Sequence, residues 1–225
     1  MFSSSDELFY AYRKSGLRLT DRLLDVGAGS GAHVLELWDA GVAGASGVDP
    51  FVPQSIVTDG AVLVHKCNLG EMEGEFDFIT FHHSLEHMPD QIQALSEAQR
   101  LLSGRGKILV RVPTVSSEAF DVYRADWVAL DAPRHFYLHS HESIAFAAAR
   151  AGLDVKKLWC DSNEMQFMGS EQYRKNIPLT DPCSVAYGGR QRLFSRAQRR
   201  EYRRRAEELN RVLRGDSICV LLEKK

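Results

Sequence analysis

Short apolar runs alternate with amphipathic segments along most of the chain. The run at residues 22–29 ends in glycines, apolar side chains at helical spacing follow at 32–41, and a second strand-like run occupies 44–49. A pattern that changes from strand to helix and back to strand predicts a βαβ unit.

The later part of the chain repeats this alternation. The predicted strands lie at 62–68, 76–83, 106–113 and 216–224, and the predicted helices lie at 89–102, 140–153 and 190–214. Strands that alternate with helices are typical of a parallel sheet with helices on both faces. The pattern therefore predicts an α/β fold with a doubly wound, mostly parallel sheet.

Two segments depart from the alternation. Residues 114–139 are aromatic and irregular, and residues 161–189 are polar and contain two prolines. Long connections inside a compact domain are usually functional or disordered. We predict that 114–139 form a lid-like segment over the site. Residues 161–214, which include the last predicted helix, are predicted to form a substrate-side insertion and an arginine-rich helix.

Length and composition favour a single globular domain over residues 1–225. The chain is 44% hydrophobic and 26% charged, and it contains four widely spaced cysteines without a CxxC pair. Such cysteines are typical of reduced thiols rather than of a disulfide framework or a zinc site.

No apolar run approaches the roughly 18 to 20 residues of a membrane helix, and no signal peptide is evident. We therefore expect a cytoplasmic protein without a membrane span or a metal.

The net charge of -2 conceals a strongly basic region. Residues 190–214 contain ten arginines and three glutamates, an excess of +7. Such a helix suits the phosphates of RNA, of a nucleotide-linked sugar or of a membrane surface, or it is a solvated face whose glutamates pair with the arginines. The solvated face is favoured because stacking aromatics, which sequence-specific RNA binding usually adds, are few. Nucleic acid is thus an unlikely partner.

A glycine loop follows the first predicted strand, with Gly27, Gly29 and Gly31 at alternate positions. Glycines at this place let the backbone approach a bound cofactor closely, next to the free N–H groups of a helix N-terminus. Asp49 ends the second strand, where a carboxylate accepts hydrogen bonds from the hydroxyls of a ribose. Asp25 adds a negative charge before the loop, which suits a cationic nucleoside cofactor better than a pyrophosphate.

The ordered motifs LLDVGAGSG, GVDP, FDFITFHHSLEHMPD, LLSGRGKILVRVP and DAPRHFYLHS resemble the successive signatures of class I S-adenosylmethionine-dependent methyltransferases. The resemblance covers roughly residues 20 to 155. More narrowly, the chain is similar to a small-molecule branch that includes ubiquinone-pathway O-methyltransferases and methyltransferases of bacterial polysaccharide clusters. This resemblance implies a Rossmann-like sheet of seven strands, of which the last is antiparallel.

The resemblance also implies roles for individual residues. Asp25 and the three glycines would contact the methionine part of S-adenosylmethionine, and Asp49 would contact the ribose. Asn68 stands where the family commonly has an aspartate that faces the adenine amino group, and its amide oxygen still accepts such a hydrogen bond. His82 would lie along the cofactor near the sulfonium.

Methylation of a hydroxyl also needs a general base, for which histidine is suited because it titrates near neutral pH. Of the eight histidines, His135 in the predicted lid is the first candidate and His83 the second. We expect the other histidines without special context, including His33, to serve packing, capping or the surface. Arg134 either holds an acidic group of the acceptor or forms a structural ion pair with a neighbouring aspartate.

The sequence therefore predicts a methyltransferase that acts on a small polar acceptor, a metabolite or a sugar-linked compound, with oxygen favoured as the methylated atom, and that forms S-adenosylhomocysteine. Two alternatives stay open. An RNA methyltransferase would bind RNA through the arginine-rich helix, and a non-catalytic binding or scaffold protein would keep the fold but bind the cofactor weakly or not at all. The identity of the acceptor, the pathway and the oligomeric state are not predicted.

Overall fold

The chain forms two compact units in the computed structural model, which describes residues 4–58, 60–187 and 193–225. Unit 1 contains residues 1–112, 142–158 and 219–225, and unit 2 contains residues 113–141 and 159–218. The two segments that interrupt the predicted alternation therefore both belong to unit 2.

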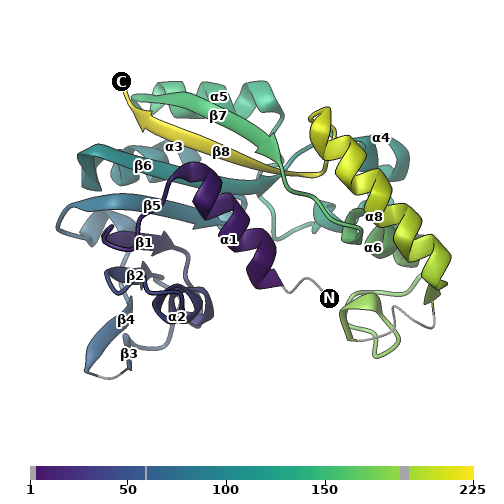
Figure 1. Ribbon diagram of the computed structural model, residues 1–225, viewed down its shortest axis with the longest axis horizontal. Coiled ribbons are helices and arrows are strands. Elements are labelled where there is room, and N and C mark those ends of the chain that lie inside the picture. Colours follow the sequence, from purple (N-terminus) through teal and green to yellow (C-terminus); the bar gives the residue numbers. More distant parts are fainter. Residues whose placement is uncertain (1–3, 59, 188–192) are drawn as a thin grey trace. The chain divides into compact units, whose positions relative to one another are not determined.

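The main feature of the fold is an eight-stranded sheet with the order β3-β4-β2-β1-β5-β6-β8-β7 (Figure 1). The strands β1, β2, β4, β5 and β6 pair in parallel, and the last strand, β8, runs antiparallel. The predicted Rossmann-like architecture is thus confirmed. The strands are β1 (Leu23–Val26), β2 (Ala45–Val48), β3 (Ile56–Thr58), β4 (Ala61–His65), β5 (Phe76–His82), β6 (Leu102–Pro113), β7 (Leu153–Cys160) and β8 (Ser217–Lys224).

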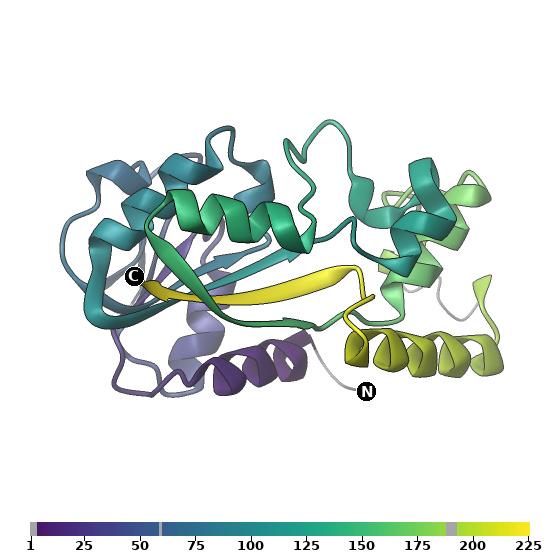
Figure 2. The ribbon, with the colours of Figure 1, turned by 90° about the horizontal axis from the view of Figure 1, so that it is seen from above.

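Helices cover both faces of the sheet in unit 1, with α3 and α5 on one face and α1 on the other (Figure 2). The α-helices are α1 (Ser4–Ser15), α2 (Ala32–Asp39), α3 (Gln91–Leu101), α4 (Glu118–Tyr123), α5 (His141–Arg150), α6 (Met165–Arg174) and α8 (Arg196–Arg211). Short 3₁₀ turns are η1 (Leu69–Glu71), η2 (Leu85–His87), η3 (Arg124–Asp126), η4 (Val128–Leu130) and η5 (Val185–Tyr187). None of these described helices is both long and apolar enough to cross a membrane.

Local chemistry explains where these elements begin and which faces they bury. All four residues of β1 are buried, as expected for an interior strand with helices on both faces. Helix α3 is capped by Asp90, whose carboxylate accepts the N–H of Gln93 at 2.9 Å, so Pro89 lies before the cap. Its buried positions Leu95, Ala98 and Leu101 recur at helical spacing.

Among the described residues the sheet has eight strands, one more than the seven expected. The additional strand, β3, pairs antiparallel with β4 at the edge of the sheet, and none of its three residues is buried. The pattern of apolar positions also missed β7, because its middle residues are polar and exposed. Neither strand has the continuous apolar run that marks a buried strand, so periodicity alone does not reveal them.

The order of the strands places β1 and β5 at the switch point of the sheet. The chain runs outward from β1 through β2 and β4, and then returns to the other side of β1 with β5 and β6. The loops that leave the carboxyl ends of β1 and β5 therefore diverge. Open α/β sheets bind their ligands at such a point.

Unit 2 has its own core around Trp127. This fully buried side chain belongs to a cluster whose other buried members are Ala119, Tyr123, Phe167, Ala206 and Leu209. Its indole N–H donates to Asp216 at 3.0 Å. Residues 114–139 are therefore partly helical and anchored inside unit 2, and their role as a lid stays a prediction.

Candidate active site

The glycine loop joins β1 to α2, and each of its three glycines has a positive φ. A Cβ on Gly27 would lie 2.5 Å from the Cβ of Ser84, and one on Gly31 would lie 2.6 Å from a methyl carbon of Leu63. The packing of unit 1 therefore requires glycine at both positions. Gly29 differs, because a Cβ at this residue would have no atom of the protein within 4 Å. The backbone at Gly29 therefore faces open space.

Asp49 ties this loop to the second strand. One of its carboxylate oxygens accepts the N–H of Gly29 at 2.9 Å, and the other accepts the N–H of Phe51 at 2.8 Å. Each carboxylate oxygen can accept a second hydrogen bond. Asp49 therefore has the remaining acceptor capacity that the predicted ribose contact requires.

Asp25 is buried and only half satisfied. One carboxylate oxygen lies 3.1 Å from Nδ1 of His33, whereas the other, Oδ1, is buried and has no hydrogen-bond partner. Nε2 of His33 lies 3.0 Å from the hydroxyl of Tyr12, which is also 3.4 Å from the hydroxyl of Thr80. A buried carboxylate oxygen without a donor is costly, so a cationic or N–H-bearing ligand would stabilise it.

His82 lies at the end of β5, and its Nε2 accepts a hydrogen bond from the guanidinium of Arg111 at 2.7 Å. Its ring also meets that of His33 edge to face at 4.7 Å between centroids. Burial, the largest cause, lowers the pKa of His82 together with the nearby Arg111 guanidinium, His33 and His83, and the combined effect brings it to about 2. His82 therefore stays neutral, and a neutral ring beside the predicted sulfonium avoids repulsion between like charges.

The lowered pKa of His82 predicts that unit 1 loses stability in acid. Below about pH 6.5 the unfolded chain takes up a proton at this histidine, whereas the folded chain does not until about pH 2. The free energy of unfolding should therefore fall by about 2 kcal/mol between pH 6.5 and pH 5 through His82 alone. Urea denaturation of the wild type and of His82→Gln, whose amide oxygen still accepts from Arg111, measures this contribution. Equal pH dependence in the two proteins would contradict it.

His83 follows directly and forms a pair with Glu86. Nδ1 of His83 lies 3.3 Å from a carboxylate oxygen of Glu86, whose side chain is only 1% exposed. The His83 side chain is 40% exposed, and its φ of +52° lies in the left-handed region that non-glycine residues seldom adopt. An Nδ1–H that donates to a carboxylate leaves the lone pair on Nε2, the arrangement that a general base needs.

Asn68 is the exposed N-cap of η1. Its backbone N–H and its side-chain NH₂ both donate to the Glu71 carboxylate, at 2.7 Å and 3.1 Å, as part of a capping box. Capping explains this residue locally. The predicted contact with adenine therefore depends on the remaining acceptor capacity of its amide oxygen.

His135 belongs to unit 2, where it is part of a local cluster. Its Nδ1 lies 3.0 Å from the carbonyl oxygen of Ala129, and Nε2 lies 3.7 Å from the carboxylate of Asp131. The side chain is 9% exposed. Arg134 forms an ion pair with the same aspartate at 2.5 Å, which raises the pKa of the guanidinium, so the ion-pair interpretation of Arg134 fits the structure.

Unit 1 therefore brings together most of the predicted site. Asp25, the glycine loop, Asp49, His82 and His83 all lie at or just beyond the carboxyl ends of β1, β2 and β5. Sequence reasoning missed His33 and Arg111. The position of His33, two residues beyond Gly31 in the first turn of α2, is the signal that would have marked it, because that turn faces the end of β1.

These residues fit S-adenosylmethionine on three independent grounds. The partnerless oxygen of Asp25 offers an acceptor to a cationic ligand, the backbone at Gly29 faces open space, and Asp49 retains acceptor capacity. In addition, the N-cap of α2 is Gly31, which makes no side-chain cap, so backbone N–H groups at the start of this helix are available to a ligand.

Comparisons with known proteins agree with this geometry. A family model described as a methyltransferase domain matches residues 6–158. A ubiquinone/menaquinone biosynthesis C-methyltransferase, UbiE, from Geobacter sp. (strain M21) is 32% identical over 116 residues, which cover 45% of this chain and 49% of the relative. The chain thus spans about half the length of the curated relatives that it matches.

Solved structures show the same fold. An S-adenosylmethionine-dependent methyltransferase from Mesorhizobium loti matches with a TM-score of 0.59 and 15% identity, covering 98% of this chain and 100% of that one. A Burkholderia thailandensis 1,6-didemethyltoxoflavin-N1-methyltransferase, solved with S-adenosylhomocysteine, matches with a TM-score of 0.54 and 14% identity, covering 99% of this chain and 79% of that one. These comparisons confirm the predicted family at the level of a methyltransferase domain. The chain belongs to the family of methyltransferase domains.

Proposed function

We propose that this protein binds S-adenosylmethionine in unit 1 and methylates a hydroxyl group of a small polar acceptor, a metabolite or a sugar-linked compound. The observation that carries this proposal is the pairing of the half-satisfied Asp25 with the His83–Glu86 pair in one unit. Asp25 attracts a cationic cofactor, and the His83–Glu86 pair supplies a base that takes the proton of the acceptor hydroxyl.

Each part of the cofactor has a counterpart among the residues of unit 1. Oδ1 of Asp25 would accept from the ammonium of the methionine part, the backbone at Gly29 would lie against it, and Asp49 would accept from the ribose hydroxyls. Asn68 would accept from the adenine amino group. When bound, the cofactor supplies the methyl group on a sulfonium, which is the reactive part of the chemistry.

The protein's own part in catalysis is to position the acceptor and take its proton. Nε2 of His83 would take the proton of the acceptor hydroxyl as its oxygen receives the methyl group that the bound cofactor would supply. Glu86 holds the imidazole in the tautomer that this step requires and stabilises the imidazolium that results. His135 remains the alternative base, since its Nδ1 contact with a carbonyl selects the same tautomer.

Calorimetric titration tests the cofactor before any acceptor is known. We expect the wild type to bind S-adenosylmethionine and S-adenosylhomocysteine but not NAD. Asp49→Ala should weaken binding by about 100-fold, because it removes charged hydrogen bonds worth about 1.5 to 3 kcal/mol each. Asp49→Asn, which keeps one acceptor oxygen, is the matched variant. A folded wild type that binds neither sulfur nucleoside would instead support the scaffold alternative.

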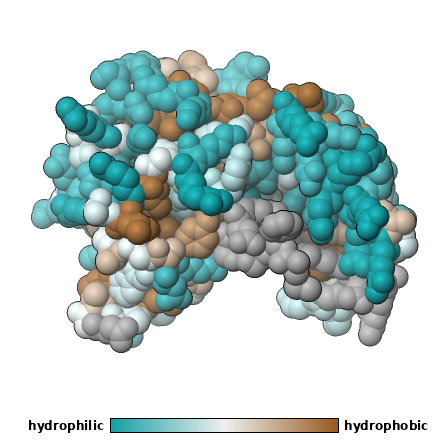
Figure 3. Space-filling model, in the orientation of Figure 1, coloured by the Kyte–Doolittle hydropathy of each residue, from teal (hydrophilic) through white to brown (hydrophobic). Residues whose placement is uncertain are grey.

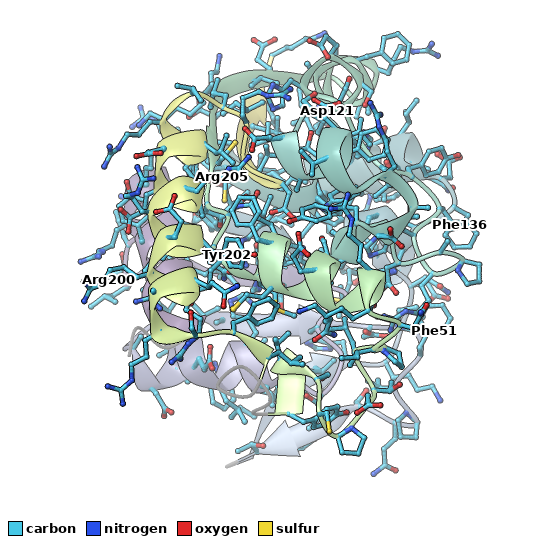
Figure 4. The ribbon with its side chains drawn as sticks, turned by 90° about the vertical axis from the view of Figure 1, so that its right-hand side faces the viewer. Phe51, Asp121, Phe136, Arg200, Tyr202 and Arg205 are labelled. Atoms are coloured by element: carbon cyan, nitrogen blue, oxygen red, sulfur yellow. The ribbon has the colours of Figure 1, made fainter. Side chains whose placement is uncertain are left out.

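The arginine-rich helix bears on the RNA alternative. Hydrophilic residues gather over α8 in unit 2 (Figure 3), and residues 190–192 of the predicted helix lie outside the described residues. Three arginines of α8 have carboxylate partners: Arg203 pairs with Glu164, Arg204 with Glu201 and Glu208, and Arg205 with Glu118. Arg200 points away from α6, whereas Tyr202 points toward it (Figure 4).

These ion pairs support a mainly solvated helix, so we expect only weak RNA binding. Fluorescence anisotropy with a short labelled RNA should show weak affinity that disappears as salt rises. The measurement should be repeated on a variant in which Arg196, Arg199 and Arg200 are replaced by alanine. Tight binding by the wild type that this variant loses, together with a smaller salt dependence, would favour the RNA methyltransferase.

A further inference from the structure

A network of polar contacts connects four elements of unit 1. It runs from Thr80 of β5 to Tyr12 of α1, then to His33 of α2, and ends at Asp25 of β1. The separations are 3.4, 3.0 and 3.1 Å. Tyr12 is 2% exposed and Asp25 is 3% exposed, whereas the His33 side chain is 12% exposed, so water reaches this network mainly at His33.

This geometry accommodates two arrangements of hydrogens without any movement of heavy atoms. In the first, the Tyr12 hydroxyl donates to Nε2 of a neutral His33, and Nδ1–H donates to Asp25. In the second, His33 carries both protons and is an imidazolium, and its Nε2–H donates to the Tyr12 oxygen. The Tyr12 hydroxyl then donates to Thr80 instead. The network can therefore take up one proton.

The charged and titratable groups around His33 determine which arrangement is stable. Asp25 favours the imidazolium, whereas the N-terminal end of α2, in which His33 lies, disfavours it. Burial and Asp25 raise the pKa of Tyr12, so its hydroxyl keeps its proton and acts only as a donor and acceptor. The remaining groups that face the network are His82 from β5, Arg111 from β6, Cys219 from β8, and His83 after β5.

We infer that His33 is a positioning residue that neutralises Asp25 in the cofactor-free protein and releases a proton when the cofactor binds. The inference rests on the proposed function, in which the ammonium of the cofactor comes to the free oxygen of Asp25. The His33 imidazolium and the ammonium of the cofactor would repel each other at one carboxylate, so binding of the ammonium favours neutral His33. Because His33 keeps its contact through Nδ1–H, Asp25 stays in place for the ligand.

Proton release gives the affinity a definite pH dependence. Since the bound state holds fewer protons than the free state, binding of S-adenosylhomocysteine should tighten as the pH rises. The limit is tenfold per pH unit for one proton. Measurement of the affinity at several pH values from about pH 5.5 to pH 8.5 tests this dependence.

Calorimetry in buffers of different ionisation enthalpy counts the protons directly. We expect release of up to about one proton when S-adenosylhomocysteine binds to the wild type near neutral pH. His33→Gln, whose amide can still donate to Asp25, should bind with almost no release, and Tyr12→Phe should reduce the release because it removes the acceptor of Nε2–H. His65→Gln, a histidine of unit 1 outside the network, is the matched control and should behave as the wild type.

The outcomes separate this inference from the proposed function. If the folded wild type does not bind S-adenosylhomocysteine, the proposed function fails first. If it binds with no buffer dependence, or if His33→Gln releases as many protons as the wild type, the role of His33 is overturned. Should His33→Gln not fold, nitrogen NMR of the wild-type histidines decides, since the His33 ring must change from doubly to singly protonated on binding.

Discussion

Replacement of Gly29 by alanine should abolish most cofactor binding while the protein stays folded. The new methyl group meets no protein atom within 4 Å, so the packing of unit 1 is unaffected. Its φ of +52° costs alanine about 1 to 2 kcal/mol of stability. In the cofactor complex, however, the methyl group would occupy the space proposed for the ligand. A steric overlap of this kind costs about 1 to 3 kcal/mol, or about 5- to 150-fold in Kd.

Two other glycines provide the controls for this experiment. Gly60 also has a positive φ and no atom within 4 Å of its Cβ position, but it lies in the turn between β3 and β4. Gly60→Ala should therefore lose similar stability and bind S-adenosylhomocysteine normally. Gly27→Ala should unfold unit 1 instead, because of its contact with Ser84. If calorimetry finds normal binding by Gly29→Ala, the cofactor does not lie against the loop as proposed.

The second large effect is expected at His83. His83→Gln should lower kcat by about 100- to 10,000-fold, the usual contribution of a general base, and leave the Kd of S-adenosylhomocysteine nearly unchanged. Glu86→Gln should lower kcat as well, because the imidazole loses the carboxylate that orients it. Steady-state kinetics with an acceptor found by screening measure kcat. Calorimetry measures the Kd of S-adenosylhomocysteine separately.

His135→Gln distinguishes the two candidate bases. If the His83 proposal is right, this variant should keep most of the wild-type kcat, whereas the opposite result would transfer the role to His135. His65→Gln serves again as the control for the loss of a histidine in unit 1. If kcat is unchanged in all of these variants, the acceptor needs no base from the protein.

The glycine loop and Asp49, which we propose as the cofactor site, could be located from the sequence because they are close together in the chain. Gly27, Gly29 and Gly31 follow a buried strand directly, and Asp49 ends the next one. A short strand, a tight turn and a helix are local structures, so their positions follow from residue types and periodicity. The interpretation of 114–139 as wholly irregular was less successful, because α4 is only six residues long and its apolar positions pack against distant α6 and α8.

The sequence by itself thus determined the α/β class, the glycine loop with Asp49, and the family of the chain. Tertiary structure alone decided the polar partners: His33 for Asp25, Arg111 for His82, and Tyr12 from a helix that precedes the first strand. These contacts join residues from different strands and helices, and the parallel sheet brings them together at its switch point. The periodicity of apolar residues within one segment does not predict these contacts, because the contacts depend on strand order and register rather than on spacing along the chain.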